Sequence, residues 1–282
     1  MRITSKIKGG LGNQMFQYAC GRAITHRLGA QLCLDISWFK KGNREYALDN
    51  FPHIQSIKKS HSTGMPSLFQ KIFRRLKIHY FHEPDYSYWP GIEKIKTSAH
   101  ITGYWQNENY FSAISPIIKQ DFQFPEFTCP EAEEIAGKIK EAPCPVSIHI
   151  RRGDYVENDN VNKIFGTCSL EYYQKALHMI TEKNNMPMQL FLFSDDPEWI
   201  KNNFDTQGCT SAIIDIPQHK NTPHHDMHLM SLCSHHIIAN SSFSWWGAWL
   251  SNRQGTVIAP EQWFAKETRK HHNPAAKLWI KI

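Results

Sequence analysis

The second half of the chain alternates short apolar segments with amphipathic ones, and this alternation limits its fold more than any other feature. Strands are predicted over 146–150, 189–193, 212–215, 236–239 and 256–259, and helices over 169–183, from 196 onward, over 226–234 and over 244–250. Repeated strand–helix units of this length predict an α/β fold, with a doubly wound parallel sheet and helices on both of its faces.

The first half opens with a similar unit. A strand is predicted over 3–8, a tight loop over 9–12, a helix over 13–28 ended by Gly29, and a strand over 32–35. Gly10 and Gly12 have the spacing of a dinucleotide-binding fingerprint, and Asp35 stands where a ribose-binding acid is expected. Met15 takes the place of the third glycine, so a nicotinamide-dependent oxidoreductase is the weaker alternative.

The length of 282 residues is enough for two domains of about 100 to 150 residues each. Pro143 and Pro145 interrupt the pattern after a helix predicted over 131–141. We therefore expect an N-terminal domain over 1–143, a second domain over 144–260, and a C-terminal segment over 261–282 that packs back across the domains.

The charge and the cysteines narrow the class of protein. The formal charge is 32 − 26 = +6, which suits an anionic small ligand or a membrane surface. No basic stripe is interleaved with aromatic residues, so nucleic acid is not an expected partner. Seven cysteines without a Cys-x-x-Cys pair indicate neither a disulfide framework nor a zinc site, and they favour a reducing compartment.

The chain shows no sign of a membrane-spanning segment. Its first residues run directly into a predicted strand, and no run of about 18 apolar residues follows, so we expect a cytoplasmic protein. Residues 67–80 form a candidate amphipathic helix rich in lysine and arginine. It is interpreted as an ordinary surface helix or, alternatively, as a peripheral contact with the inner face of the membrane.

Charged side chains gather where the strand over 146–150 ends. His149, Arg151, Arg152 and Asp154 lie at its carboxyl end, where open α/β sheets bind ligands. Two guanidinium groups there can grip a phosphate or pyrophosphate, and each charge-assisted hydrogen bond contributes about 1.5 to 3 kcal/mol. The alternative is a surface salt bridge between an arginine and Asp154.

Two further strand ends carry polar side chains. Ser241, Ser242 and Phe243 lie between a strand and a helix, where free backbone N–H groups attract a phosphate, although an ordinary serine N-cap would have the same pattern. Asp195 can accept hydrogen bonds from a base or a ribose, whereas Asp196 is placed to cap the helix that follows it.

The segment Tyr104, Trp105 and Gln106 combines aromatic faces with an amide. This composition suits a sugar, and a pair of core aromatic residues is the equal alternative. No acidic triad and no His-Glu-x-x-His pattern is present in the sequence, so we expect no metal site.

Four segments resemble, in their order along the chain, the signatures of the α1,2-fucosyltransferases. They are KGGLGNQMFQYA over 8–19, SIHIRRGDY over 147–155, LFSDD over 192–196 and IANSSFSWWGA over 238–248. GYWQ over 103–106 and CSLEYY over 168–173 also resemble bacterial members. The ordered set, from residue 8 to about residue 260, is far more specific than any single segment.

The resemblance implies a GT-B fold, with two Rossmann-like domains that face a cleft. It also implies inverting, metal-independent transfer of L-fucose from GDP-L-fucose to the 2-hydroxyl of a β-galactoside, by a bacterial, cytoplasmic enzyme without a resident cofactor. Domain 144–260 would bind GDP-fucose and domain 1–143 would lie on the acceptor side.

The resemblance also assigns roles to residues. Arg151 would contact the β-phosphate and the leaving oxygen, and His149 would lie against the nucleotide. Ser241, Ser242 and Phe243 would hold the pyrophosphate. The remaining candidates are Asn13 near the reacting carbon; Arg152, Asp195, Gly10 and Gly12 for the donor; and Tyr104, Trp105 and Gln106 for the acceptor.

The mechanism expected from the residues agrees with this. A cation at the β-phosphate stabilises the charge that develops on GDP, and Arg151 can supply it. The acceptor hydroxyl must lose a proton to a base, for which Asp154, Asp35 and a phosphate oxygen are the candidates. A catalytically silent GDP- or glycan-binding module remains an alternative, against which the presence of Arg151 and Asn13 argues.

Overall fold

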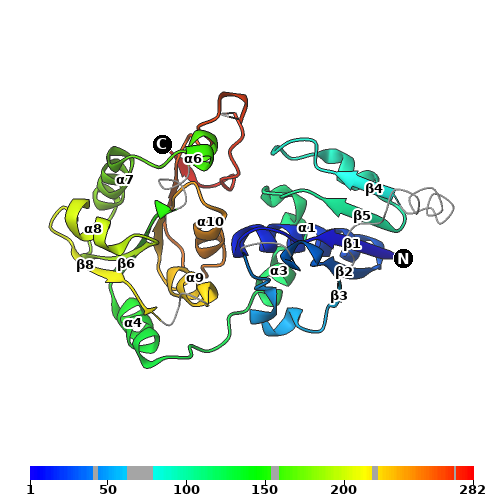
Figure 1. Cartoon of the computed structure of the whole chain (residues 1–282). Helices are drawn as coiled ribbons and strands as arrows, with labels where there is room; N and C mark the ends of the chain where they lie inside the picture. Colours follow the sequence, from blue (N-terminus) through cyan, green and yellow to red (C-terminus); the bar gives the residue numbers. More distant parts are fainter. Residues whose placement is uncertain (41–43, 62–78, 154–158, 218–221, 270) are drawn as a thin grey trace. The chain divides into compact units, whose positions relative to one another are not determined.

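The computed structural model describes residues 1–40, 44–61, 79–153, 159–217, 222–269 and 271–282. The chain divides into two compact units, Met1–Pro125 and Glu126–Ile282, and each has its own parallel sheet (Figure 1). The division precedes the boundary expected at 143/144, which is corrected here. Helix α4 (Pro130–Glu141) belongs to the second unit because its apolar face packs into the core of that unit.

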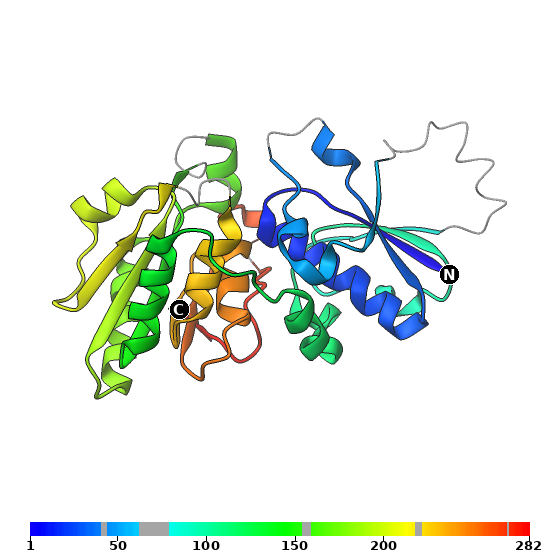
Figure 2. The same ribbon diagram turned by 90° about the horizontal axis from the view of Figure 1, so that it is seen from below.

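In the first unit, the described strands are ordered β3-β2-β1-β5-β4 and all pair in parallel. Their bounds are β1 (Arg2–Lys6), β2 (Gln31–Asp35), β3 (Lys58–Ser60), β4 (His79–His82) and β5 (Ala99–Thr102). Helices α1 (Leu11–Leu28) and α3 (Ser115–Asp121) belong to the same unit. Figure 2 shows α1, in blue, alongside this sheet.

The opening strand–helix–strand unit is found as predicted. Helix α1 begins two residues earlier than expected, at Leu11, and ends at Gly29. Gly29 has φ 58°, a left-handed conformation that glycine adopts without strain, and its N–H bonds to the carbonyl of Thr25. Short 3-10 helices span Ser37–Lys40, Leu48–Asn50, Pro52–Ile54, Pro90–Lys94, Glu108–Tyr110 and Ser112–Ile114.

In the second unit, the described strands are ordered β11-β10-β9-β6-β7-β8, again in parallel. Their bounds are β6 (Cys144–Ile150), β7 (Met188–Ser194), β8 (Thr210–Ile214), β9 (His235–Ile237), β10 (Val257–Ala259) and β11 (Ile280–Lys281). The helices are α4, α6 (Asp159–Phe165), α7 (Leu170–Lys183), α8 (Pro197–Asn203), α9 (Pro223–Ser231) and α10 (Ser242–Trp249), with a 3-10 helix over Glu267–Arg269.

The second sheet is covered on both faces, as the alternation of strands and helices predicts. Apolar residues of α7 and α8 pack in one core cluster and those of α4 and α9 in another. Every residue of β6 is buried between these layers, as in parallel sheets with helices on both faces. Ser169 caps α7 and Asp196 caps α8, each accepting a hydrogen bond from a backbone N–H of the first helical turn.

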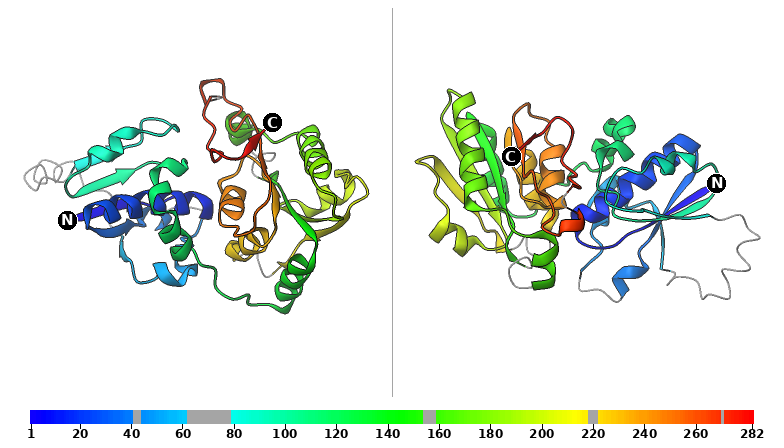
Figure 3. Two further views of the ribbon diagram at one scale, coloured as in Figure 1. Left: turned by 180° about the vertical axis from the view of Figure 1, so that it is seen from behind. Right: turned by 90° about the horizontal axis from the view of Figure 1, so that it is seen from above.

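The C-terminal segment belongs to the second unit. Strand β11, in red at the C-terminus in Figure 3, pairs with β10. The ring of Trp279 lies 5.3 Å from that of Trp245. The indole of Trp245 also donates a hydrogen bond to the carbonyl of Pro274, at 2.8 Å. Part of the segment over 261–282 thus forms an edge strand of the second sheet, and its packing back across the domains stays a prediction.

The basic segment over 67–80 falls almost wholly outside the described residues. Its last two residues lie in strand β4, so the predicted helix does not extend to Tyr80. Within the described ranges, no helix combines the length and the apolar character that crossing a bilayer requires.

Candidate active site

The topology of the second unit marks one edge of its sheet. Strands β7 and β8 lie on one side of β6, and β9, β10 and β11 lie on the other, so the strand order reverses at β6 and β9. Ligands of open α/β sheets bind at the carboxyl ends of the strands beside such a switch point. Ile150 of β6 pairs with Ser194 of β7, which brings the residues that follow the two strands together.

Two arginines and two aspartates meet at this edge. Nη1 of Arg151 lies 2.7 Å from Oδ2 of Asp195, and the other oxygen of Asp195 accepts a hydrogen bond from the backbone N–H of Arg152 at 2.9 Å. The Arg152 guanidinium reaches Oδ2 of Asp196 at 3.4 Å and lies 3.9 Å above the Trp199 ring. Asp195 thus orients Arg151, a role that the sequence had not indicated.

Gly153 leaves room for the same carboxylate. A Cβ atom at this position would lie 2.4 Å from Oδ2 of Asp195, so a larger residue would displace that side chain. Asp154, the expected salt-bridge partner and candidate base, lies outside the described residues.

His149 is the buried member of this group, with 6% of its surface exposed. The hydroxyl of Tyr173 donates a hydrogen bond to the carbonyl of His149, and the imidazole ring lies 5.7 Å from the ring of Phe243. Its Nδ1 is buried without a hydrogen-bond partner among the described residues. Burial lowers its pKa to about 4, which the nearby Asp195 opposes and Arg151 reinforces, so the imidazole is neutral at pH 7.

Helix α10 begins close to His149, because Phe243, whose ring lies 5.7 Å from the imidazole, is in its first turn. Ser241 is its N-cap, and the serine Oγ accepts a hydrogen bond from the N–H of Phe243 at 3.3 Å. The interpretation of Ser241 as a cap is therefore confirmed, and α10 begins at Ser242 instead of Ser244. The first turn of such a helix presents backbone N–H groups and a positive dipole end to an anion.

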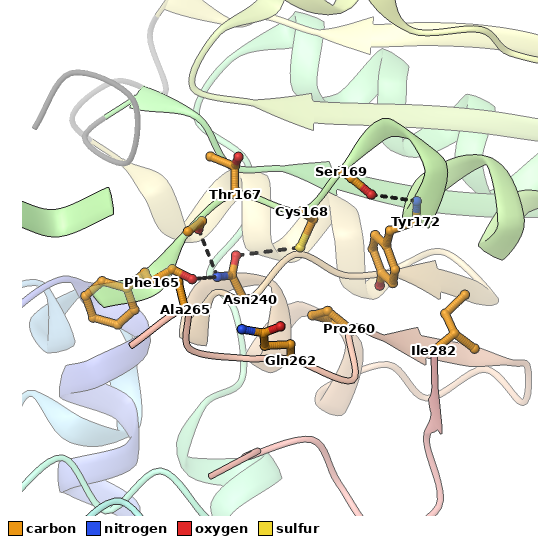
Figure 4. Close-up of a pocket in the computed structure, with 11 residues that line it drawn as sticks. Phe165, Thr167, Cys168, Ser169, Tyr172, Asn240, Pro260, Gln262, Ala265 and Ile282 are labelled. Carbon is orange, nitrogen blue, oxygen red and sulfur yellow. Dashed lines mark hydrogen bonds between the residues drawn. The ribbon is translucent and has the colours of Figure 1, made fainter. Parts of the chain in front are cut away.

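Asn240 anchors the loop that leads into α10. Its Nδ2 donates to the carbonyls of Phe165, Gly166 and Trp263 at 2.9, 3.1 and 3.2 Å, and its Oδ1 lies 3.7 Å from the thiol of Cys168 (Figure 4). The side chain is 3% exposed. Its position between a strand end and a serine cap was the available sequence signal for this role.

A cavity of about 280 Å³ lies next to Asn240. It opens where β9, β10 and β11 end, and its wall includes Thr167, Ser169, Gln262 and the C-terminal Ile282 (Figure 4). Hydroxyl, amide and thiol groups thus face a hollow in the unit that carries the arginine pair.

The first unit has a comparable edge. Its strand order reverses between β1 and β5, and Asn13 and Gln106 follow these two strands. Nε2 of Gln106 donates a hydrogen bond to Oδ1 of Asn13 at 2.6 Å. Two candidates that are 93 residues apart in sequence are therefore in direct contact.

The aromatic residues beside Gln106 have different environments. Trp105 is 0% exposed and packs edge-on against Tyr110, with ring centres 5.3 Å apart, so it is a core residue and offers no face to a sugar. Tyr104 stacks on Tyr86, and the ammonium of Lys8 lies 4.3 Å above its ring. The expectation of a sugar platform at Trp105 is corrected accordingly.

The glycines of the first loop have different environments. Gly9 has φ 82°, and a Cβ there would lie 2.9 Å from Nδ2 of Asn13, so the backbone requires glycine at this position. Gly10 is the N-cap of α1 and Gly12 lies in its first turn. A Cβ at Gly10 would approach nothing closer than Arg44, at 4.0 Å, and donor binding by Gly10 and Gly12 stays a prediction.

Glu83 is a site residue that the sequence analysis missed. It follows β4 directly, and its carboxylate accepts hydrogen bonds from the backbone N–H groups of Tyr104 and Trp105. Burial raises its pKa to about 7, although these two hydrogen bonds and Lys8 favour the charged form. The signal was present as a carboxylate two residues after Phe81, but the segment before it, up to Tyr80, was assigned to a helix.

Metal ligands are not assembled in the part of the chain that the structure describes, since no group of three or more His, Cys, Asp or Glu side chains is placed to hold an ion. Asp35, the other candidate base, accepts a hydrogen bond from the N–H of Ser37 at 3.0 Å.

Proteins of similar sequence or fold identify the family of this chain. The chain is 35% identical over 294 residues to an alpha-1,2-colitosyltransferase of Escherichia coli, covering 99% of this chain and 98% of that protein. It is 24% identical over 265 residues to galactoside alpha-(1,2)-fucosyltransferase 1 of Homo sapiens, covering 89% and 66%. The crystal structure of NodZ alpha-1,6-fucosyltransferase soaked with GDP-fucose matches with a TM-score of 0.54 and 12% identity, over 88% of this chain and 92% of that one.

The likeness to NodZ concerns the fold and confirms the GT-B type expected for two parallel-sheet units. A family model described as glycosyl transferase family 11 matches residues 1–282, the entire sequence. The chain therefore belongs to glycosyltransferase family 11.

Proposed function

We propose that this glycosyltransferase moves L-fucose from GDP-L-fucose to the 2-hydroxyl of a terminal β-galactoside, with inversion. The observation that carries the proposal is the Arg151–Asp195 pair at the switch point of the second unit, beside the neutral His149. Two relatives whose names specify alpha-1,2 transfer support the linkage.

Each candidate site residue of the second unit named below has a role in this proposal. Arg151, held by Asp195, stabilises the negative charge that develops on the β-phosphate as the sugar–phosphate bond breaks. The hydroxyl and the N–H of Ser242 bind the pyrophosphate, together with the N–H of Phe243, which exchanges its hydrogen bond to the cap Ser241 for one to a phosphate oxygen. His149 and Arg152 lie against the nucleotide, and the uncharged imidazole can exchange hydrogen bonds with a base or a ribose.

In the first unit, Asn13 and Gln106 hold the acceptor, with Tyr104 beside them. Their hydrogen-bonded pair offers both amide donors and carbonyl acceptors to sugar hydroxyls. The acceptor hydroxyl loses its proton as the new bond to the anomeric carbon forms and GDP leaves. Asp154, Asp35 and a phosphate oxygen remain the candidates for the proton acceptor.

A second donor is favoured by one observation. The relative at 35% identity is named a colitosyltransferase, and colitose differs from fucose in lacking the 3-hydroxyl. The same phosphate-binding residues would serve a GDP-linked donor of either sugar.

The experiment supplies GDP-fucose or GDP-colitose with a panel of galactosides, in excess EDTA and with added magnesium or manganese. Product mass and GDP release are measured, and the linkage is assigned by NMR. We expect transfer to the 2-hydroxyl with equal rates in EDTA. Loss of activity in EDTA with rescue by metal would refute metal independence, and GDP binding without transfer would favour a silent binding module.

A further inference from the structure

Glu83 joins two strand ends of the first unit. It follows β4, which lies beside β5 at the edge of the sheet (Figure 1). One carboxylate oxygen accepts a hydrogen bond from the N–H of Tyr104 at 2.6 Å, and the other accepts one from the N–H of Trp105 at 2.9 Å. A single side chain therefore holds two successive peptide groups of the loop after β5, and we call this pair of hydrogen bonds the Glu83 grip.

The gripped loop is strained and tightly packed. Trp105 has φ 55°, in the left-handed region that side chains other than glycine rarely adopt. A Cβ at Gly103 would lie 2.4 Å from Cβ of Glu83 and 2.7 Å from its Oε2. The loop conformation therefore depends on the carboxylate, and the carboxylate fits only because residue 103 is glycine.

The next residue in the loop is Gln106, whose side chain bonds to Asn13. Because Gln106 directly follows the two gripped peptide groups, their position sets the position of its Cα. The grip at Glu83 is thus coupled to the polar pair at the switch point of the sheet.

We propose that Glu83 is the positioning residue of the acceptor site, and that its bidentate grip on the 104–105 backbone holds Gln106 and Asn13 in the arrangement that binds the acceptor. The part that concerns the acceptor rests on the proposed function above. The grip itself does not depend on it.

The charge of Glu83 governs the grip. An ionised carboxylate offers two acceptor oxygens, whereas a protonated one turns an oxygen into a donor hydroxyl, which opposes a backbone N–H. Burial raises the pKa of Glu83 to about 7. The titratable groups that interact electrostatically with it are Lys8 after β1, Asp85 on its own segment, Cys20 of α1 and Tyr110.

The test uses Glu83→Gln, because glutamine has the shape of the protonated acid. At pH 8 we expect backbone amide exchange over 103–106 to quicken, and the acceptor KM to rise, each on the order of tenfold, as for the loss of one charge-assisted hydrogen bond. The GDP affinity should stay unchanged. In the wild type the acceptor KM should rise as the pH falls from 8 to 6, and in Glu83→Gln it should be uniformly high.

Glu83→Asp and Glu93→Gln are the controls. Aspartate keeps the charge and both acceptors, so the pH dependence should return in part. Glu93 is exposed in the same unit and accepts a hydrogen bond from Tyr88, so Glu93→Gln should behave as the wild type.

Unchanged exchange over 103–106 in Glu83→Gln would overturn the grip, whatever the activity. Faster exchange with an unchanged acceptor KM and pH profile would overturn the link to the acceptor. Absence of sugar transfer by the wild type would instead overturn the proposed function, and with it the acceptor role, while the exchange result would still decide the grip.

Discussion

At the scale of single residues, two carboxylates organise the two strand edges in the same way. Asp195 and Glu83 each follow a strand and accept hydrogen bonds from backbone N–H groups of a neighbouring loop. Each also leaves no room for a Cβ at a nearby glycine, Gly153 or Gly103. Side chains proposed to touch substrate are thus held by acids that need not touch it.

Replacing Arg151 by lysine should abolish most transfer while the protein stays folded. Lysine keeps the charge beside Asp195 but loses the planar fork that can bond a carboxylate and a phosphate together. The fall in kcat should be about 10²-fold or more, as for the loss of one oxyanion donor. Steady-state kinetics would show this, with exposed Arg253→Lys as the unaffected control. A kcat within about threefold of wild type would remove Arg151 from this role.

Replacing Gly153 by alanine should weaken GDP binding. The added methyl group meets Oδ2 of Asp195, so the carboxylate must move and Arg151 loses its fixed position. Calorimetric titration of GDP should show an affinity reduced about tenfold, equivalent to about 1.4 kcal/mol.

Gly137→Ala is the matched control for this change. Gly137 lies inside α4, and a Cβ there would have nothing within 4 Å. Alanine should therefore leave GDP binding unchanged and stabilise the helix by about 0.5 to 1 kcal/mol. Equal GDP affinities for the two variants would contradict the role assigned to Gly153.

At the scale of elements, the second unit has buried or half-buried histidines on several strands and helices. His149 on β6, His228 on α9 and His236 on β9 have their pKa lowered to about 4, 4 and 3, chiefly by burial. His236 is also tied to β6, because its Nδ1 lies 2.8 Å from the hydroxyl of Ser147. These elements pack in their observed arrangement with the imidazoles uncharged.

The second unit should therefore lose stability in mild acid. A histidine whose pKa is 6.5 when unfolded and about 4 when folded binds its proton preferentially in the unfolded chain, so its contribution is complete above pH 6.5 and is lost as the pH falls toward 4. Each such histidine should lower the free energy of unfolding by about 2 kcal/mol between pH 7 and pH 5. Urea unfolding at several pH values measures this.

Two variants sharpen the measurement. His228→Phe keeps an aromatic ring against Phe127, whose ring lies 4.4 Å from that of His228, and should reduce the loss in acid. His178→Gln, at a mostly exposed position on α7, should leave the profile unchanged. A pH profile of His228→Phe identical to that of the wild type would show that His228 does not contribute.

At the scale of the whole molecule, the proposed donor and acceptor residues fall in different units. Arg151, Asp195 and Ser242 belong to Glu126–Ile282, and Asn13 and Gln106 belong to Met1–Pro125. Each unit brings its candidates together at the switch point of its own sheet. Binding of the two substrates should accordingly be separable by mutation.

Gln106→Ala should raise the galactoside KM by about tenfold and leave GDP affinity nearly unchanged, since the amide faces Asn13 within the first unit. Ser242→Ala in the first turn of α10 should weaken GDP binding instead. Calorimetry with GDP, beside acceptor kinetics, separates the two effects. If Gln106→Ala weakens GDP as much as Ser242→Ala does in folded protein, the assignment of substrates to units is wrong.

The sequence by itself determined the features that depend on short-range patterns. Strand and helix periodicity, the caps Asp196 and Ser241, and the end of α1 at Gly29 are local, because capping and hydrogen bonding there involve residues within a few positions. Since carboxyl ends of parallel strands meet at one edge, these patterns also placed Arg151 and Asp195 at the same edge of the second sheet, where the structure has them in contact.

Only the tertiary structure decided which distant side chains meet. Asp195 contacts a residue 43 positions away, and Glu83 contacts one 21 positions away, so neither partnership leaves a periodic trace in the sequence. Burial likewise depends on packing by the whole unit, which is why Trp105 is fully buried although the preceding Tyr104 is only half-buried. The observed unit boundary precedes the predicted one for the same reason, because the apolar face of α4 is buried against the sheet that follows it in the chain.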